Sequence, residues 1–166
     1  MSGRTANLVG FFCCAAALGF AYYSQYVMHL EPCPLCIFQR VGVFFIGVVF
    51  LAAAAQDPVA WGRRVYAAAL AIATCATIGV ALRHLWVQSQ PPGSVAACGA
   101  TLDFMLKVFP LRDVLVKVLA GSGECAKIDW RLLGLSMPAW VLVFAAVVGG
   151  FGLWANLRRQ PPVLQF

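Results

Sequence analysis

The stretch of residues 31–55 reads EPCPLCIFQRVGVFFIGVVFLAAAA and joins a cysteine pair to a long apolar run. Two cysteines in a Cys-x-x-Cys spacing stand near its start, and an apolar run follows in which Arg40 is the single charged residue. A helix of about 20 residues, rising about 1.5 Å per residue, crosses a hydrocarbon core of about 30 Å. The run is therefore long enough to span a membrane, and it places a dithiol at the membrane edge.

Apolar runs of similar length occur elsewhere in the chain. The predicted spans are about residues 8–28, 37–55, 65–85 and 137–157. Lipid offers no hydrogen bonds, so a spanning backbone must satisfy its own polar groups, which favours helices. The composition agrees, because 62% of residues are hydrophobic and 11% are charged, against about 45–50% and about 25% in ordinary soluble domains. The sequence predicts an all-α, polytopic membrane four-helix bundle, formed as a single integral membrane domain over residues 1–166.

The first span has an alternative interpretation as a cleaved signal peptide. Arg4 precedes its apolar run, and the small residues Ala15, Ala16 and Ala17 lie within it. However, the run continues for about 21 residues, whereas the apolar region of a signal peptide is about 7–15 residues long. The length favours a membrane span.

The net charge of +6 raises the question of a nucleic-acid partner. The basic residues form no long run and are not interleaved with exposed aromatic residues, so we expect no nucleic acid among the partners. Lysines and arginines near span ends instead mark the cytoplasmic side of a membrane protein. The arginines packed most densely at the predicted span ends are Arg4, Arg63, Arg64, Arg158 and Arg159.

This charge pattern predicts a multi-pass membrane protein with cytoplasmic N- and C-termini. In a bacterial-type cell the loops at about residues 29–36 and 86–136 are then periplasmic. The second loop also carries five basic residues, but four acidic residues nearly offset them. The prediction therefore depends on the density of positive charge at the span ends.

The seven cysteines divide into two groups once the spans are drawn. Cys13, Cys14 and Cys75 fall inside spans, where cysteine is a small apolar filler, and we assign them no function. The other four fall on the predicted periplasmic side, where disulfides form and persist. These are Cys33, Cys36, Cys98 and Cys125.

Two structural roles compete with a redox role for the outer cysteines: a pair of inert disulfides, or a Cys₄ zinc site. Cys98 and Cys125 are 27 positions apart, unlike the short second knuckle of a zinc site, so we expect no metal. A disulfide closing the two-residue loop between Cys33 and Cys36 would restrain little chain entropy. That spacing is more typical of a reactive couple.

The surroundings of Cys36 suit a reactive thiol. We expect Pro32 and Pro34 to keep the backbone out of the helix, so that the second span begins at about Cys36, where the helix dipole favours a thiolate. Arg40 follows by four positions, on the same helix face and about one turn deeper. Arg40 either extends its side chain to lipid phosphates or holds an anion or a polarised oxygen beside Cys36.

The long outer loop contains both remaining cysteines. Cys98 lies among small residues, and Cys125 follows a Gly-Ser-Gly sequence, so both are expected on flexible backbone suited to thiol exchange. Between them, apolar residues recur at helical spacing over residues 111–119, after Pro110. This pattern predicts a short amphipathic interfacial helix in the second periplasmic loop.

Several of these features together resemble a known family. They are residues 33–36 (CPLC) with Arg40, the widely spaced Cys98 and Cys125, and residues 133–140 (LGLSMPAW) at the start of the fourth span. The chain resembles the DsbB-type disulfide-bond formation proteins, which are quinone reductases of the bacterial inner membrane. The Cys-x-x-Cys motif alone is not specific, because thioredoxin-like enzymes carry it on a βαβ pattern that is absent here. In the known relay, DsbA, DsbB and quinone together keep the periplasm oxidising.

The resemblance implies an enzyme, a protein dithiol:quinone oxidoreductase with four catalytic cysteines. It implies that Cys98 and Cys125 form the disulfide that reoxidises a periplasmic DsbA-like thiol oxidase. It also implies that Cys33 and Cys36 pass two electrons to ubiquinone or menaquinone in the lipid bilayer. Arg40 and Cys36 match the quinone site, and His84 corresponds either to a family histidine near the quinone or to a solvated interfacial histidine.

Other functions remain open at this stage. The chain could be a specialised paralogue that serves one dedicated oxidase, or an analogue of vitamin-K-epoxide reductase. From a different class, it could be a membrane scaffold with two structural disulfides and no enzymatic activity. Quinone reduction that depends on a reduced dithiol partner separates the enzymes from the scaffold.

Overall fold

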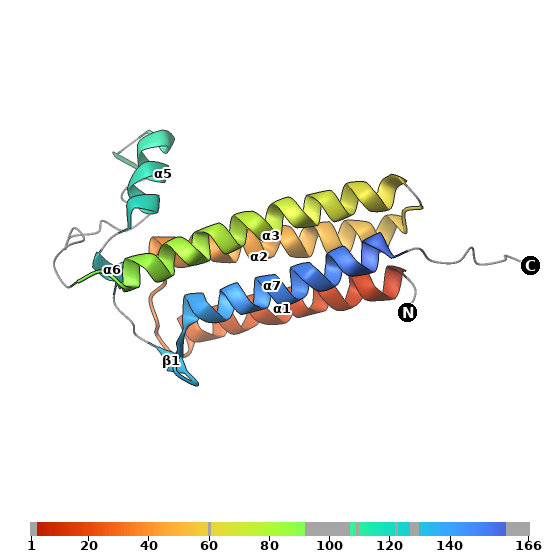
Figure 1. Cartoon of the computed structure of the whole chain (residues 1–166). Coiled ribbons are helices and arrows are strands. Elements are labelled where there is room, and N and C mark those ends of the chain that lie inside the picture. The colour runs from red at the N-terminus through yellow and green to blue at the C-terminus, as the bar shows by residue number, and fades with distance from the viewer. Residues whose placement is uncertain are drawn as a thin grey trace, which may run out of the picture.

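Four long helices form a bundle (Figure 1). They are α1 (Gly3–Tyr26), α2 (Pro34–Gln56), α3 (Trp61–Gln88) and α7 (Met137–Leu157). The computed structural model describes residues 3–59, 61–91, 107–108, 110–121, 123–126 and 130–158. Helices consecutive in the bundle run in opposite directions, with α2 packed between α1 and α3, and α7 packed against α3 and α1. The predicted membrane four-helix bundle is confirmed.

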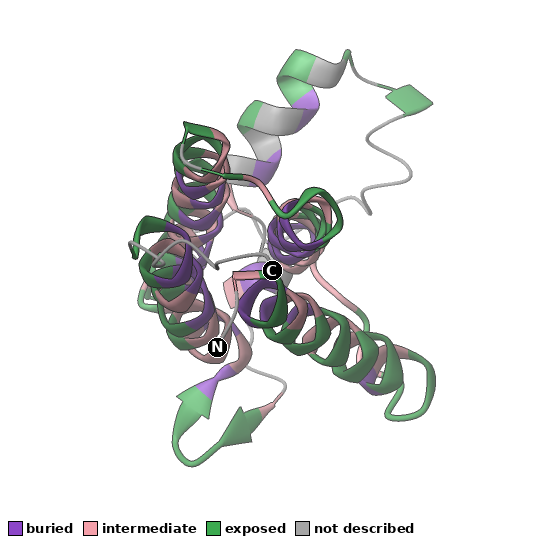
Figure 2. Cartoon of the chain, turned by 90° about the vertical axis from the view of Figure 1, so that its right-hand side faces the viewer, coloured by how far each residue is buried: buried purple, intermediate pink, exposed green. Residues whose placement is uncertain are grey.

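All four helices are long and apolar enough to cross a membrane. Their buried residues face the bundle axis and their exposed residues face outward (Figure 2). Many of the outward side chains are large and apolar, among them Phe12, Ile72 and Val147, which are 64%, 72% and 65% exposed. Water would penalise so much exposed apolar surface, whereas lipid does not. The chain is a multi-pass membrane protein.

Small residues allow the helices to approach one another closely. The ring of Phe50 on α2 is fully buried between Gly10 of α1 and Gly152 of α7. A Cβ atom at Gly10 would lie 2.6 Å from that ring, and one at Gly152 would lie 2.5 Å from it. Membrane helices associate largely through this kind of packing, since lipid provides no hydrophobic force between them.

A buried pair of amides fixes α1 against α7. Asn156 donates to Asn7 Oδ1 at 2.9 Å, and Asn7 donates to Asn156 Oδ1 at 3.3 Å. Asn156 also donates to the carbonyl of Gly152 at 2.8 Å. Buried amides are costly unless they are hydrogen-bonded. The reciprocal pair therefore favours one register of the two helices.

The smaller elements lie at the end of the bundle opposite the start of α1 and the end of α7 (Figure 1). They are helices α5 (Leu111–Ala120) and α6 (Gly123–Ala126) and the hairpin of β1 (Arg131–Leu132) and β2 (Leu135–Ser136). The hairpin turns through Leu133 and Gly134, both with positive φ, at 52° and 81°. Positive φ at both central residues is typical of the tight turn that joins two antiparallel strands.

The observed helices differ from the predicted spans mainly at their ends. Helix α3 extends beyond residues 65–85 at both ends. In the first extension Arg63 donates to the carbonyl of Ala155 at 3.2 Å, and in the second Trp86 packs under the guanidinium of Arg83. The predicted helix at residues 111–119 forms as α5, with Val114 and Val118 buried. Its location on the membrane surface stays a prediction. The short hairpin was not predicted.

Candidate active site

The first turn of α2 places the Cys-x-x-Cys sulfurs. Helix α2 begins at Pro34, and Cys33 is its N-cap, whose sulfur accepts a hydrogen bond from the Cys36 backbone N–H at 3.4 Å. The expectation that Pro34 lies outside the helix is therefore wrong. Proline suits the first helical position because its φ is already helical and its missing N–H would have no partner there. Cys36 lies within the first turn, and the sulfur at the helix N-terminus is that of Cys33.

Cys33 and Cys36 are positioned to form a disulfide. Their sulfurs are 3.3 Å apart, with the Cys33 thiol donating to Cys36. Both residues are half-buried. A disulfide requires an S–S distance of about 2.05 Å, so a small movement of the side chains would join the two sulfurs.

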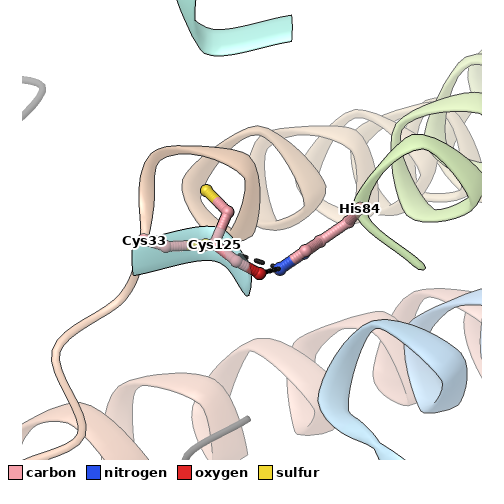
Figure 3. A group of neighbouring side chains, drawn as sticks. All are labelled: Cys33, His84 and Cys125. Atoms are coloured by element: carbon pink, nitrogen blue, oxygen red, sulfur yellow. Dashed lines mark hydrogen bonds between the residues drawn. The ribbon is translucent and has the colours of Figure 1, made fainter. Parts of the chain in front are cut away.

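His84 and Cys125 meet Cys33 at the same place. His84, on α3, is 2% exposed, and its Nε2 lies 3.7 Å from Cys33 Sγ and 3.1 Å from the Cys125 carbonyl oxygen. Figure 3 shows this carbonyl, from α6, directed at the His84 ring. The sulfurs of Cys33 and Cys125 and a ring nitrogen of His84 all lie within 4.8 Å of one another. The fold thus brings together residues that are far apart in the sequence.

Cys125 is held at this place by apolar packing. It is 1% exposed and packs in a cluster with Leu35 of α2, Val87 of α3, and Val114 and Val118 of α5. Helices α5 and α6 therefore dock on the start of α2 and the end of α3. Cys98 lies outside the described residues, and so does any disulfide between Cys98 and Cys125.

Arg40 reaches across from α2 to α1. Its Nη1 donates to Gln25 Oε1, its Nη2 donates to the Ala21 carbonyl at 3.0 Å, and its Cζ lies 5.5 Å from the centre of the Tyr22 ring. These three partners are neutral, so they orient the guanidinium without cancelling its charge. The positive charge remains available to a negatively polarised group nearby.

A cavity of about 730 Å³ connects these groups. It lies among α1, α2, the outer end of α3, the start of α7 and the hairpin, and its walls include Ile37, Val141 and Phe144. This size and a largely apolar lining fit a drug-sized apolar ligand with a few polar anchors. The polar and sulfur-bearing residues that line it include Cys33, Cys36, Gln39, Arg40, His84 and Gln88.

Gln39 is the residue that the sequence analysis missed. It is 2% exposed, and its Nε2 lies 3.3 Å from His84 Nδ1. A polar amide within an apolar run, beside Arg40, was the available signal. A polar amide in an apolar run needs a hydrogen-bond partner, but the sequence does not show that this partner is a histidine 45 positions away.

Comparisons with known proteins identify the family. The family model described as disulfide bond formation protein DsbB matches residues 3–155. The chain belongs to the DsbB family. It is therefore a disulfide bond formation protein, with an oxidoreductase role in which cysteines make and break disulfides.

Several DsbB-family relatives match over nearly their whole length, each named disulfide bond formation protein B. The relative from Nitrosococcus oceani is 49% identical over 154 residues, which are 93% of this chain and 91% of the relative. That from Methylococcus capsulatus is 46% identical over 160 residues, or 95% and 98% of the two chains. That from Chromobacterium violaceum is 48% identical over 147 residues, or 89% of each.

The site also contains residue types that bind metal ions. Cys33, His84 and Cys125 could together hold a thiophilic ion such as Zn²⁺. The ion requires thiolates, so any disulfide formed by Cys33 or Cys125 removes a ligand. Disulfide chemistry, which is the role of the DsbB family, and metal binding thus compete for the same sulfurs.

Proposed function

We propose that this protein reoxidises a periplasmic DsbA-like thiol oxidase and passes the two electrons, through two cysteine pairs, to a membrane quinone, either ubiquinone or menaquinone. The observation that carries the proposal is the approach of Cys33, Cys125 and His84 to within 4.8 Å, beside a large apolar cavity. One cysteine from each proposed pair is thereby within reach of the other pair.

The first steps are thiol–disulfide exchanges. A thiolate of the reduced partner attacks Cys98 in the Cys98–Cys125 disulfide, forming a mixed disulfide and releasing Cys125 as a thiolate. Cys125 then attacks Cys33 in the Cys33–Cys36 disulfide, so that a Cys33–Cys125 bond forms and the electron pair leaves on Cys36. The short distance between Cys33 and Cys125 supports this second step.

The cavity supports a quinone as the electron acceptor. Its walls are largely apolar, and Cys36 and Arg40 both line it. A bound quinone supplies the capacity to take up two electrons and two protons and to leave as the quinol. Arg40 would donate hydrogen bonds from its positively charged guanidinium to a carbonyl oxygen of the quinone.

The partner's second thiolate attacks the mixed disulfide, which releases the oxidised partner and a Cys98 thiolate. Cys98 then attacks Cys125 in the Cys33–Cys125 bond, so that Cys98 and Cys125 pair again and Cys33 leaves as a thiolate. Cys33 and Cys36 lose two electrons when they rejoin as a disulfide, and the quinone would take these up.

The position of the site supports the cellular arrangement that we propose. Cys33, Cys36 and Cys125 lie at the bundle end that carries α5, α6 and the hairpin, and Arg63 and Arg158 lie at the other end. A periplasmic location of the cysteine end gives the thiols access to a water-soluble partner and the cavity access to lipid-soluble quinone. The termini are then cytoplasmic, and the membrane is the bacterial inner membrane.

The test is quinone reduction by purified protein supplied with a reduced DsbA-like partner. The parent should bleach the ubiquinone absorbance at a rate that depends on the partner, whereas Cys36→Ser should not. The intramembrane variant Cys75→Ser is the matched control and should behave as the parent does. Reduction by Cys36→Ser at the parental rate would contradict the proposal, and no reduction by the parent with either quinone would favour a scaffold with structural disulfides.

A further inference from the structure

Gln39 lines the cavity and contacts the His84 ring. Its amide comes from α2 and meets the His84 ring from α3, with 3.3 Å between Gln39 Nε2 and His84 Nδ1. Both side chains are 2% exposed. A buried amide is costly unless it is hydrogen-bonded, so this contact is a major determinant of how both side chains are oriented.

The contact of the other ring nitrogen, Nε2, indicates which nitrogen of His84 carries the proton. His84 Nε2 lies 3.1 Å from the carbonyl oxygen of Cys125, which can only accept a hydrogen bond. Nε2 must therefore carry a hydrogen. In a neutral ring Nδ1 is then a bare acceptor, and the Gln39 amide N–H is the group that can donate to it. Both contacts fit the neutral Nε2–H tautomer.

We propose that Gln39 is a positioning residue that holds His84 in its neutral Nε2–H tautomer, so that the ring presents a hydrogen-bond donor to Cys33 and to the Cys125 carbonyl. His84 then stabilises a thiolate at Cys33 and does not remove a proton from that thiol. Its Nε2 is 3.7 Å from Cys33 Sγ, and the Cys36 backbone N–H is 3.4 Å from the same sulfur. Two donors therefore converge on Cys33.

The role of these hydrogen bonds in thiol–disulfide exchange rests on the proposed function. When the Cys98 thiolate attacks Cys125 in a Cys33–Cys125 disulfide, a Cys98–Cys125 bond forms and the bond to Cys33 breaks. The electron pair passes to the Cys33 sulfur, which becomes a thiolate, so the step needs no external oxidant. The His84 and Cys36 N–H groups lie where that charge develops.

Nitrogen NMR of the histidines tests the tautomer directly. The chain has only two histidines, so ¹⁵N-histidine labelling of a His29→Asn protein gives the signals of His84 alone. We expect the Nε2–H pattern. Gln39→Leu should give a mixture of tautomers, and the isosteric Gln39→Glu should move a proton onto Nδ1, because a carboxylate only accepts. Gln88→Leu removes an amide that lines the same cavity and bonds Ser136, and it should leave the spectrum unchanged.

A second measurement tests the donor role at the sulfur. In a protein carrying Cys36→Ser, Cys98→Ser and Cys125→Ser, the main-chain groups around Cys33 are retained and Cys33 is the sole outer cysteine. The rate of its alkylation by iodoacetamide, read on the Cys33 peptide by mass spectrometry, reports its thiolate. Gln39→Leu should lower this rate by roughly tenfold, the size of one lost hydrogen bond to a charged group, and Gln88→Leu should not change it.

Neither measurement requires the partner or a quinone, so the inference can fail while the proposed function stands, and the reverse is also possible. An Nδ1–H pattern in the parent would overturn the inference. A His84 spectrum that is the same in Gln39→Glu as in the parent would also overturn it, even if Gln39→Leu failed to fold. A higher alkylation rate in Gln39→Leu would show that His84 does not act as a donor to Cys33.

Discussion

Arg40 shows how a charged residue is tolerated at the edge of an apolar bundle. Its N–H groups are directed to Gln25 and Ala21 of α1, and the Tyr22 ring lies against its guanidinium, so three neutral groups fix it to the neighbouring helix. The sequence predicted that Arg40 shares a face with Cys36, because spacing along a helix is local information. The partners on α1 depend on packing, which spacing alone does not report.

Replacement of Arg40 should weaken quinone binding. We expect Arg40→Ala to raise the apparent KM for quinone roughly 10- to 100-fold, the value of a lost hydrogen bond from a charged group. Arg40→Lys keeps the charge but loses the planar fork, so it should retain partial activity. The measurement is quinone reduction over a range of quinone concentrations. Arg64→Ala, exposed at the far end of α3, is the control, and unchanged quinone kinetics in Arg40→Ala would refute the role.

A glycine between α5 and α6 helps to set the position of Cys125. Gly121 lies between α5 and α6 with φ of 88°, and a Cβ there would lie 2.7 Å from Val87 Cγ2. Both the backbone conformation and the contact with α3 therefore require glycine. The sequence predicted flexible backbone at Cys125, and this is wrong: Cys125 lies in helix α6 and is buried. The sequence could not show the docking on Val87, because that contact joins distant parts of the chain.

Gly121→Ala should therefore separate Cys125 from Cys33. In a protein carrying Cys36→Ser and Cys98→Ser, oxidation should link Cys33 to Cys125, and the added methyl group should slow this roughly 10- to 100-fold, since a misplacement of about 1 Å can cost that much. The measurement is the loss of free thiols at these two cysteines. Gly79→Ala, where a Cβ meets no atom within 4 Å, is the matched control. Equal rates for the two alanine variants would show that Gly121 does not position α6.

The amide pair between α1 and α7 should contribute to stability at the other end of the bundle. Asn156→Leu leaves Asn7 buried without its reciprocal partner, so the free energy of unfolding in detergent should fall by about 1 kcal/mol. Adding Asn7→Leu removes the unpaired amide and should restore much of the loss. A double variant less stable than Asn156→Leu alone would argue against this interpretation.

For the whole molecule, hydrophobicity and charge were sufficient to predict the bundle. Long apolar runs have one stable solution in lipid, and the four helices follow it. The short elements at the end of the bundle were less predictable. Helix α6 and the hairpin owe their positions to contacts with α2, α3 and α7. The cluster of Cys33, His84 and Cys125 arises only from that long-range docking.

The proposed orientation predicts opposite locations for two reporters. An enzyme reporter that works only in the cytoplasm should be active when fused after Phe166, and one that works only in the periplasm should be active when inserted near Gly93. A reporter of the periplasmic kind fused after Phe166 serves as the control and should be inactive. The reverse pattern would place the cysteines in the reducing cytoplasm and would contradict the proposed function.

Disulfide mapping during turnover can show whether electrons cross from one cysteine pair to the other between Cys125 and Cys33. The protein is mixed with reduced partner and quinone, quenched in acid within the first turnovers, blocked at its free thiols and mapped by mass spectrometry. We expect a transient Cys33–Cys125 disulfide with a free thiol at Cys36. Quinone reduction at the full rate with no Cys33–Cys125 disulfide at any time would contradict it.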